Sequence, residues 1–445
     1  MGSPSVEAGL IALLRGRTQF AVSGHNLSAP PAAASARMEK RLMVDNVLVP
    51  SEDTKKRCAY VTQFMEEHVY SNERVLARST TPEAQALQKE LQGINKANGY
   101  WAPHLPSEAG GMGVGFLTYA YMNEIIGRSG QAPSLFGSQA PDSGNAEILH
   151  QYGTSEQKDK YLAPLVNGDV RSCFSMTEPA VSGADPTGLE TTAVREGDEW
   201  VINGRKWFSS GAIGATFAIV MAKTDPEAPP HSRFSQILVP TDTPGFNVER
   251  KVEVWGDPES NHPVIRYEDC RVPVTNLLGP QGMGFKLSQR RLGPGRIHHC
   301  MRALGQAQRA FDLLCTRAID RHAFGGPIAD KQTVQNWIAD SLVNIQAARL
   351  LTMQAAQKID SGDEARVEVS MIKFFVVNVT CEVIDKAIQV HGAMGVTTDT
   401  PLQAMYKQAR ILRIADGPDE VHRMVVSRAA LRKYRQGDVW DFQSF

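Results

Sequence analysis

The 445-residue sequence has no long hydrophobic run, almost no net charge and few cysteines. Its apolar stretches are too short to span a bilayer, so no membrane partner is expected. The formal net charge of −1 argues against nucleic acid, or any other polyanion, held by bulk charge. The six cysteines are scattered without a Cys-x-x-Cys pair. We therefore expect reduced thiols of an intracellular protein and no metal site.

The remaining composition is that of an ordinary globular protein, with 42% hydrophobic and 21% charged residues. A chain of this length exceeds what one hydrophobic core usually serves, so we expect two or three domains.

Residues 1–37 differ from the rest of the chain. They contain Arg15, Arg17 and Arg37 against the single acid Glu7, and Ala, Pro and Ser cluster between residues 28 and 35. Two interpretations stay open. The segment is a transit peptide, which implies the mitochondrial matrix, or it is a flexible tail on a cytoplasmic protein.

Hydrophobic spacing predicts three successive regions of secondary structure. Residues 38–170 have helical periodicity, as at Leu87, Leu91 and Ile94. The glycines from 110 to 115 do not follow a strand, so they are no dinucleotide fingerprint. Residues 171–285 contain short β-branched runs, which predict a small β barrel or sandwich. The predicted strands are Thr191–Val194, Trp200–Ile202, Phe217–Ala222, Phe234–Val239, Val248–Val254 and Val264–Tyr267, with turns at 196–198, 203–204 and 243–245.

Residues 286–435 are helical again, in four long amphipathic segments that predict a four-helix bundle, and residues 436–445 form a tail. The last turn of this region holds Asp416. A helix is predicted to end at Ala415, because Gly417-Pro418 cannot continue it, and a second helix to run from Glu420 to about Tyr434. Taken alone, the turn is compatible with a plain capped helix pair.

Five segments together resemble the acyl-CoA dehydrogenase family, from about Met38 to about Arg435. They are Met176-Thr-Glu-Pro179, Asn203-Gly-Arg-Lys-Trp-Phe-Ser-Ser-Gly211, Arg321-His-Ala-Phe-Gly325 with Gln332, Gln389-Val-His-Gly-Ala-Met-Gly395, and the turn that holds Asp416. The resemblance implies the acyl-CoA dehydrogenase fold: an N-terminal all-α domain, a middle β-barrel domain and a C-terminal four-helix bundle.

The resemblance also implies an oxidoreductase of fatty acid β-oxidation that uses FAD. Such an enzyme desaturates an acyl-CoA thioester to a trans-2-enoyl-CoA. A carboxylate removes the α proton while the β hydrogen leaves as hydride to flavin N5, since no side chain accepts hydride. Asp416 stands where the family has this carboxylate, usually a Glu. Burial under flavin and acyl chain should raise its pKa.

Cofactor contacts follow from the same motifs. Near the flavin ring the resemblance implies Phe208 and Ser210, with Phe174, Met176 and Thr177 along its polar edge. The pyrophosphate and adenine of a neighbouring subunit's FAD are implied to contact Arg321, Phe324, Gln332, Gln389 and Gly392. The protein is therefore expected to be a homodimer or homotetramer. Pro418 and Glu420 depart from the family's pattern at this turn, because a Pro has no N–H donor and a Glu repels phosphate.

Substrate contacts are predicted on a helix that starts near Arg296. That arginine stands where the family contacts CoA, and the acid usual at the position of Gly293 is missing. Arg296, His299 and Arg302 are three residues apart and so share a helical face. A helix start also favours anions. We expect Arg296, His298, His299 and Arg302 to bind substrate, including an anionic group beyond the CoA.

The segments Gln139–Asn145, Leu292–Arg302 and Ala415–His422 resemble one branch of the family, whose larger members carry a kinase-like domain. That branch acts on 4-hydroxyacyl-CoAs, which are phosphorylated before the dehydrogenase domain acts. We expect a free-standing dehydrogenase domain here. Three functions stay open: desaturation with electrons passed to an electron-transfer flavoprotein, flavin-assisted elimination of phosphate from a 4-phosphoacyl-CoA, and FAD binding without catalysis.

Overall fold

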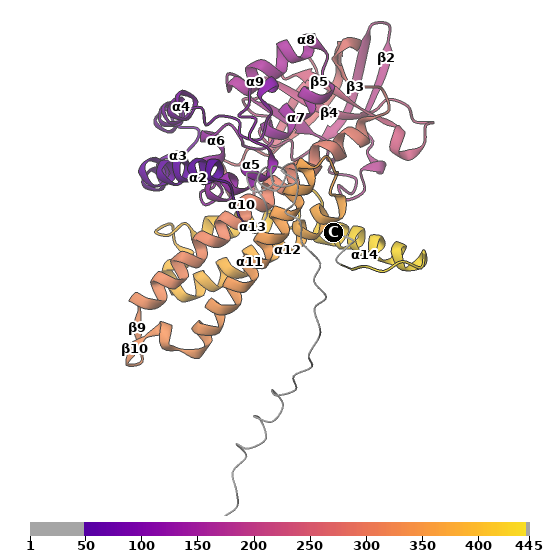
Figure 1. Cartoon of the computed structure of the whole chain (residues 1–445). Helices are drawn as coiled ribbons and strands as arrows, with labels where there is room; N and C mark the ends of the chain where they lie inside the picture. Colours follow the sequence, from indigo (N-terminus) through magenta and orange to yellow (C-terminus); the bar gives the residue numbers. More distant parts are fainter. Residues whose placement is uncertain (1–48, 442–445) are drawn as a thin grey trace, which may run out of the picture. The chain divides into compact units, whose positions relative to one another are not determined.

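The computed structural model describes residues 49–441, and the first part of this range is helical (Figure 1). Its helices are α2 (Glu52–Phe64), η2 (Met65–Val69), η3 (Tyr70–Asn72), α3 (Glu73–Leu76), α4 (Pro82–Ala97), η4 (Ser107–Ala109), α5 (Phe116–Ile126), α6 (Ala132–Leu135), α7 (Asp142–Tyr152), α8 (Ser155–Gln157), η5 (Lys158–Leu162) and α9 (Ala163–Asn167). The 1–37 segment, with its two interpretations, lies outside the described residues.

Local sequence explains where several of these helices begin. The Ser51 hydroxyl accepts a hydrogen bond from the Thr54 backbone N–H, which caps α2. Thr81 caps α4 in the same way, and Pro82 follows at a first helical position, where a missing N–H costs nothing. The glycines from 110 to 115 lie in the loop before α5 and follow no strand, as predicted.

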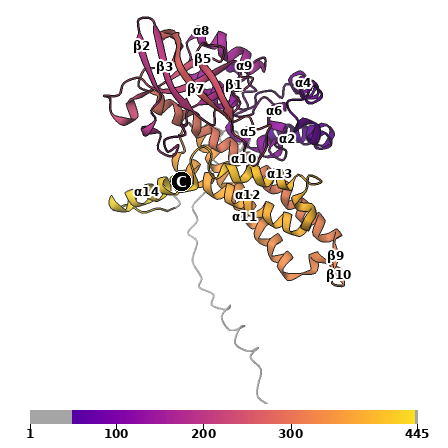
Figure 2. The same ribbon diagram turned by 180° about the vertical axis from the view of Figure 1, so that it is seen from behind.

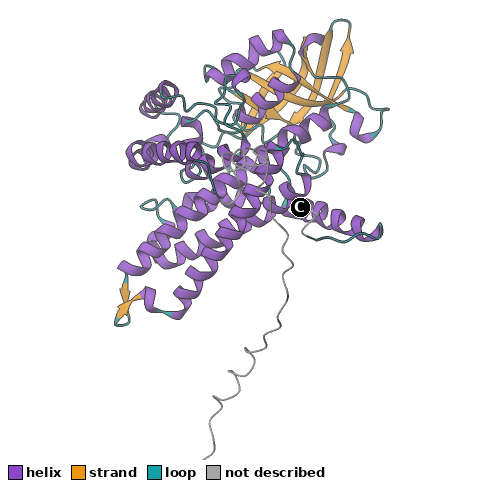
Figure 3. Cartoon of the chain, viewed as in Figure 1, coloured by secondary structure: helices purple, strands orange, loops and turns teal. Residues whose placement is uncertain are grey.

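The middle region is one eight-stranded sheet, with the strands in orange in Figure 3. Its strands are β1 (Ser172–Ser175), β2 (Thr192–Glu196), β3 (Glu199–Lys206), β4 (Phe217–Lys223), β5 (Phe234–Pro240), β6 (Phe246–Lys251), β7 (Pro263–Pro273) and β8 (Leu277–Leu278). The order along the sheet is β6-β7-β3-β2-β4-β5-β8, and β1 pairs in parallel with β4.

Alternation along β4 shows how both faces of the sheet become buried. Phe217 and Ile219 pack with residues of α7 and α9, including Leu149. Ala218 and Val220 point the other way, into a core shared with β3 and β7. Successive side chains of a strand face opposite sides, so β4 separates two hydrophobic cores.

One predicted turn is wrong. Asn203 and Gly204 lie inside β3, which runs on to Lys206, and the pairing with β7 shifts register there. A side chain at position 204 would bring its Cβ within 2.4 Å of Thr191 Oγ1. Glycine is therefore required by close backbone approach at a bulge, and not by a chain reversal.

The C-terminal region is helical: α10 (Gly284–Asp320), α11 (Gln332–Asp360), α12 (Arg366–His391), η10 (Gly392–Val396), α13 (Leu402–Leu412) and α14 (Asp419–Arg435). A short hairpin, β9 (His322–Ala323) and β10 (Gly326–Pro327), joins α10 to α11. One core contains Leu314 of α10, Ile345 of α11, Val383 of α12 and Met405 of α13. These four helices form the predicted bundle, although α13 has only 11 residues.

Two predicted helix ends are wrong. No helix starts near Arg296, because α10 begins at Gly284 and continues through Pro294. The helix before Asp416 ends at Leu412 and not at Ala415. The following helix, α14, begins at Asp419, within one residue of the prediction. The first error removes the helix-start argument for an anion site at Arg296.

The three-part fold class is confirmed, with helices, then a β region, then a helical bundle. Helix α10 contacts all three parts, since it packs on α5 and α7, on β5, and on α11 and α12. Figures 1 and 2 both show the β9–β10 hairpin at the end of the bundle distant from strands β2 to β5. The exact limits of the three domains stay predictions.

Candidate active site

The backbone of Asp416 is held in the turn between α13 and α14. Its φ of +57° is left-handed, which is uncommon for a residue other than glycine. Its carbonyl oxygen accepts hydrogen bonds from Arg296 Nε at 2.8 Å and His422 Nε2 at 3.3 Å. A side chain at position 417 would approach His422 Nε2 to 2.8 Å, so glycine is required there. The turn therefore presents Asp416 in a fixed direction.

A buried lysine closes the same turn. Lys373 of α12 is fully buried, and its Nζ donates to the carbonyl of Leu412, the last residue of α13. It also donates to the carbonyl of Gly417 at 3.4 Å. The free carbonyls at the end of a helix need such donors. Lys373 thus fixes the end of α13 and the residue after Asp416 together.

The carboxylate of Asp416 faces α10. Its Oδ2 lies 3.2 Å from Nε2 of His299, and the side chain is 26% exposed. Burial pushes the pKa of Asp416 upward, but the contact with His299 and the guanidinium charges of Arg291 and Arg296 hold it well below its ordinary value. The raised pKa that the sequence predicted for Asp416 took account of burial but not of these neighbouring groups. In the structure Asp416 is ionised at neutral pH and can act as a base.

The neighbouring carboxylate Asp419 is occupied elsewhere. Its Oδ2 accepts hydrogen bonds from Arg413 Nε and from Asn378 Nδ2, both at 2.9 Å. The side chain is buried. Glu420, the next acid, is exposed in the first turn of α14. Of the three acids in this turn, Asp416 alone combines partial exposure with contacts to α10.

A second buried cation lies beside Asp416. The guanidinium of Arg291 stacks over the Phe174 ring at 4.0 Å, and its Nε donates to Asn145 Oδ1 at 2.8 Å. Its Nη2 donates to the carbonyl of Pro141 at 3.4 Å. The segment 139–145 therefore anchors a cation whose charge acts on Asp416. The sequence of this segment alone did not indicate such a role.

The residues after β3 form an aromatic and hydroxyl surface. Phe208 is 40% exposed and has a left-handed φ of +50°. Its ring lies edge-on to Trp207, and the His262 ring is 5.6 Å away. The hydroxyl of Ser210 is 2.6 Å from Nδ1 of His262. A flat apolar face next to an oriented hydroxyl suits a flat heteroaromatic ring with polar edges.

A buried ion pair supports the neighbouring loop. Nζ of Lys206 donates to the Met176 carbonyl at 2.7 Å and to Glu178 Oε1 at 2.8 Å. The Thr177 hydroxyl donates to the Trp207 carbonyl at 2.8 Å. Burial lowers the pKa of Lys206 to about 8, and the adjacent Glu178 counteracts this fall. The structure thus brings all five residues predicted at the flavin ring to the start of the β region and the end of β3.

The other predicted cofactor residues lie at the β9–β10 end of the bundle, far from the strands (Figures 1 and 2): Arg321, Phe324, Gln332, Gln389 and Gly392. Phe324 is 97% exposed at a left-handed φ of +50°. Val334 of α11 and Val390 of α12 share one core beneath this end. The structure therefore gathers these residues, but not around the ring site of the same chain.

The four predicted substrate residues divide into two groups. Arg296 and His299 contact Asp416, and Arg302 contacts His299. The three therefore lie together, as their spacing predicted. His298 is 1% exposed and points elsewhere, with Nε2 at 3.4 Å from Glu147 Oε1. His298 therefore lies off the face that Arg296, His299 and Arg302 share, and its role in substrate binding stays a prediction.

The surroundings of His298 are polar but poorly paired. Its ring lies edge-on to those of Tyr119 and His104. Burial lowers the pKa of His298 well below its ordinary value and that of His104 to about 3, and it raises the pKa of Glu147 to about 8. Among the described residues, His298 Nδ1, both His104 nitrogens and Glu147 Oε2 have no hydrogen-bond partner. Such groups usually face water or a ligand.

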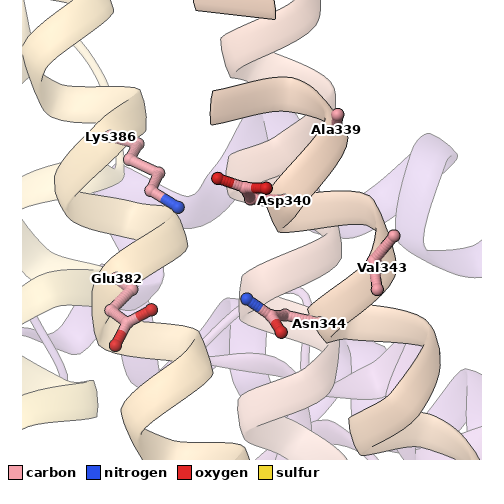
Figure 4. Close-up of a pocket in the computed structure, with 6 residues that line it drawn as sticks. All are labelled: Ala339, Asp340, Val343, Asn344, Glu382 and Lys386. Atoms are coloured by element: carbon pink, nitrogen blue, oxygen red, sulfur yellow. The ribbon is translucent and has the colours of Figure 1, made fainter. Parts of the chain in front are cut away.

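Other surface features lie outside this site. A polar groove between α11 and α12 is lined by Ala339, Asp340, Val343, Asn344, Glu382 and Lys386 (Figure 4). In Figure 4, Lys386 and Asp340 point toward each other across it. None of its residues contacts Asp416. Within residues 49–441, no helix is long and apolar enough to cross a membrane, and no cluster of three or more acidic, His or Cys side chains could hold a metal ion.

Comparison with known proteins agrees with this architecture. Three family models match in succession: acyl-CoA dehydrogenase N-terminal domain at residues 51–169, middle domain at 173–270 and C-terminal domain at 282–431. The chain therefore belongs to the acyl-CoA dehydrogenase family, which consists of flavin-dependent oxidoreductases.

Individual relatives agree. The chain is 46% identical over 385 residues to "Probable acyl-CoA dehydrogenase FadE2" of Mycobacterium tuberculosis, a match that covers 84% of this chain and 94% of that protein. It is 41% identical to acyl-CoA dehydrogenase family member 10 of Mus musculus over 94% of this chain, but spans only 40% of that protein. The structure of butyryl-CoA dehydrogenase from Megasphaera elsdenii superimposes with a TM-score of 0.77 at 28% identity and covers 87% of this chain and 100% of that one.

The family's flavin can be tested against the residues present. The exposed Phe208 face, the hydroxyls of Thr177 and Ser210 and the backbone around Met176 offer one apolar surface with hydrogen-bonding groups at its edge. This donor set fits an isoalloxazine ring. The predicted residues thus suit the cofactor chemically as well as by motif.

Three functional residues were missed from the sequence: Arg291, His262 and Lys373. Arg291 stands directly before the segment Leu292–Arg302, and this position was its only signal. His262 precedes β7, in a stretch whose proximity to Ser210 depends on sheet pairing. Lys373 sits within the strongly periodic helix α12, where one buried charge among apolar neighbours was the available sign.

Proposed function

We propose that the chain is an FAD-dependent acyl-CoA dehydrogenase that desaturates an acyl-CoA thioester between Cα and Cβ to a trans-2-enoyl-CoA. The observation that carries this proposal is the Asp416 carboxylate. It is ionised, partly exposed and in contact with His299, and Arg296 holds the backbone carbonyl of the same residue. The chemistry of the family needs such a base. Asp416 removes the α proton. Bound FAD would accept the β hydrogen as hydride.

The flavin ring is held by the loop at the start of the β region and by the residues after β3. Phe174, Met176 and Thr177 lie along its polar edge. Phe208 and Ser210 flank the ring. The buried contacts beneath them support this role, because Lys206 fixes the Met176 carbonyl. Pro418, which has no N–H, and the exposed acid Glu420 contribute nothing attractive to a phosphate.

The pyrophosphate and adenine are held by a second copy of the chain. Arg321, Phe324, Gln332, Gln389 and Gly392 gather at the far end of the bundle, which supports contacts to another subunit's FAD. The almost fully exposed Phe324 ring supports burial in such an interface. The working enzyme is then a homodimer or homotetramer that passes its electrons to an electron-transfer flavoprotein. Whether it works in the cytoplasm or the mitochondrial matrix depends on residues 1–37.

The test is the Asp416→Asn variant. It should keep its FAD and its fold, but the rate at which hexanoyl-CoA bleaches the flavin should fall at least ~10³-fold, as expected for loss of a general base. Asp399→Asn, at an exposed site, is the matched control. Retained bleaching in Asp416→Asn would contradict the assignment and move it to Asp419 or Glu420.

A second candidate function is elimination of phosphate from a 4-phosphoacyl-CoA, which ends in an enoyl-CoA without net oxidation. The observation that favours it is the set of unpartnered polar groups around His298 and the nearby Arg302. Buried groups without partners suit a substrate that brings polar atoms of its own. Both ring nitrogens of His299 are already engaged, whereas Nδ1 of His298 has no hydrogen-bond partner among the described residues, so His298 is the better anion contact.

The two substrate classes separate in one comparison. Flavin bleaching by hexanoyl-CoA and product formation from 4-phosphohexanoyl-CoA are measured in wild type and in His298→Ala. An anion contact predicts a larger loss on the phosphorylated substrate. An equal factor on both substrates contradicts the anion role of this cluster.

A further inference from the structure

We propose that His299, oriented by Arg302, is a positioning residue that donates a hydrogen bond to the Asp416 carboxylate and so keeps it ionised and aimed at the substrate. The inference rests on the proposed role of Asp416 as the base. It adds to that role a device within α10 that sets the direction and the proton affinity of the base.

The geometry is a chain of two contacts. Nη2 of Arg302 lies 3.2 Å from Nδ1 of His299, and Nε2 of His299 lies 3.2 Å from Oδ2 of Asp416. Arg302 is itself fixed, because its Nη1 donates to the Ser138 carbonyl at 3.0 Å. His299 and Arg302 are three residues apart on α10, so they lie on the same face of that helix.

Donor and acceptor roles in this chain follow by elimination. A guanidinium can only donate, so Nδ1 of His299 must be the acceptor and carry no proton. In a neutral imidazole the other nitrogen then carries the hydrogen, and Nε2–H donates to Asp416. Burial lowers the pKa of His299, which agrees with a neutral ring. Arg302 therefore selects the tautomer that His299 needs.

Other charged or titratable groups also face this pair. They are Arg291 and Arg296 on α10, Lys373 on α12, His422 on α14, and for the imidazole its neighbour Arg302. The cations also favour the ionised carboxylate. Among the recorded contacts of residues 49–441, however, His299 is the one side chain within 4 Å of a carboxylate oxygen of Asp416. It is the group that can set direction as well as charge.

A fixed direction matters more for Asp than for Glu. The side chain has one methylene fewer, so it reaches a substrate carbon only from a close and defined backbone position. The left-handed turn and the Arg296 contact supply the position. The hydrogen bond from His299 then fixes the rotation of the carboxylate. A small displacement of the carboxylate from the substrate carbon therefore lowers the rate of proton removal.

The effect on pH dependence has a definite sign. Asp416 works as a base in its ionised form, and its pKa is held low, so wild type keeps its rate as the pH falls. Without the hydrogen bond the pKa of Asp416 rises toward and above its ordinary value, because burial is the largest influence on it and acts upward. Burial is then opposed only by the remaining cations. The acid side of the rate profile should therefore move to higher pH.

The experiment measures flavin bleaching by hexanoyl-CoA from pH 4.5 to 9 in the FAD-loaded enzyme. The variants are His299→Phe, which loses the donor, His299→Gln, whose amide restores a donor, and Arg302→Met, which leaves the tautomer unselected. His150→Gln, in α7 and outside the site, is the control. We expect an acid-side fall in His299→Phe and Arg302→Met that is absent in wild type and control and reduced in His299→Gln.

Identical pH profiles in wild type, His299→Phe and Arg302→Met would overturn the proposal. A fall of the same factor at every pH would also overturn it, because loss of packing alone has no pH signature. Asp416→Asn separates this from the function itself: if it still bleaches the flavin, the base assignment fails. A second readout is independent of turnover. ¹⁵N-histidine spectra should show the His299 signal, identified by its loss in His299→Gln, as a neutral ring protonated at Nε2.

Discussion

Replacement of Glu147 by Gln should stabilise the protein, and increasingly so as the pH rises. Glu147 is buried, with one oxygen 3.4 Å from Nε2 of His298 and the other without a partner among the described residues. Burial raises its pKa to about 8. The Gln amide has the same shape as the carboxyl group and does not ionise. The free-energy cost of keeping the buried group protonated is therefore absent in the variant.

The sign and size follow from linkage between proton binding and folding. Below the ordinary pKa of about 4.5, Glu147 is protonated in both folded and unfolded chains and favours neither. Between about 4.5 and 8 the unfolded chain releases the proton while the folded chain keeps it, so stability falls as pH rises. The pKa difference between the folded and unfolded chains corresponds to a loss of at most about 5 kcal/mol in the free energy of unfolding. Glu147→Gln should recover part of it.

The assay is the melting temperature of wild type and Glu147→Gln at pH 5, 6, 7 and 8. The variant should melt higher, and the difference should grow by a few degrees across this range. Glu66→Gln, at an exposed site, should show no such trend. A difference that stays constant or shrinks from pH 5 to 8 would refute the reasoning, because the group would then not be protonated in the folded chain.

Three further predictions concern stability, cofactor binding and the N-terminal segment. Lys206→Met should destabilise the fold by ~3–5 kcal/mol, measured by urea unfolding, since it leaves Glu178 buried without its partner; an unchanged midpoint would contradict this. Arg321→Ala should release FAD more readily on dilution while the chain stays folded, and a strictly monomeric enzyme that retains FAD would contradict the shared site. Deletion of residues 1–37 should leave the kinetics unchanged, given their composition; a large loss of activity would show otherwise.

Sequence patterns predicted the elements whose signal is local. Strands β4 and β5 followed from runs of apolar and β-branched residues, and α14 from the Gly417-Pro418 break. The short strand β1 gave no pattern, because four residues are too few to show alternation. A helix was predicted to start near Arg296, and a proline two residues earlier usually interrupts a helix. Helix α10 nevertheless continues through Pro294, since buried neighbours such as Leu292 and Ile297 pack on both sides.

The site was predictable in part for the same reason. The spacing of Arg296, His299 and Arg302 correctly placed them together, because it follows from helix geometry alone. The same spacing did not show that His298 faces Glu147, since that depends on α7 packing against α10. The pKa of Asp416 was also out of reach, because it depends on Arg291 and His299 being brought to one point by a 37-residue helix.

The most direct test of the central claim counts electrons against product. Purified enzyme with FAD is mixed with an acyl-CoA and an electron acceptor, and the electrons delivered are compared with the enoyl-CoA formed. Desaturation predicts two electrons for every enoyl-CoA, since a hydride leaves with each turnover. Enoyl-CoA that accumulates from a 4-phosphoacyl-CoA with released phosphate and no delivered electrons would contradict the account and establish elimination in its place.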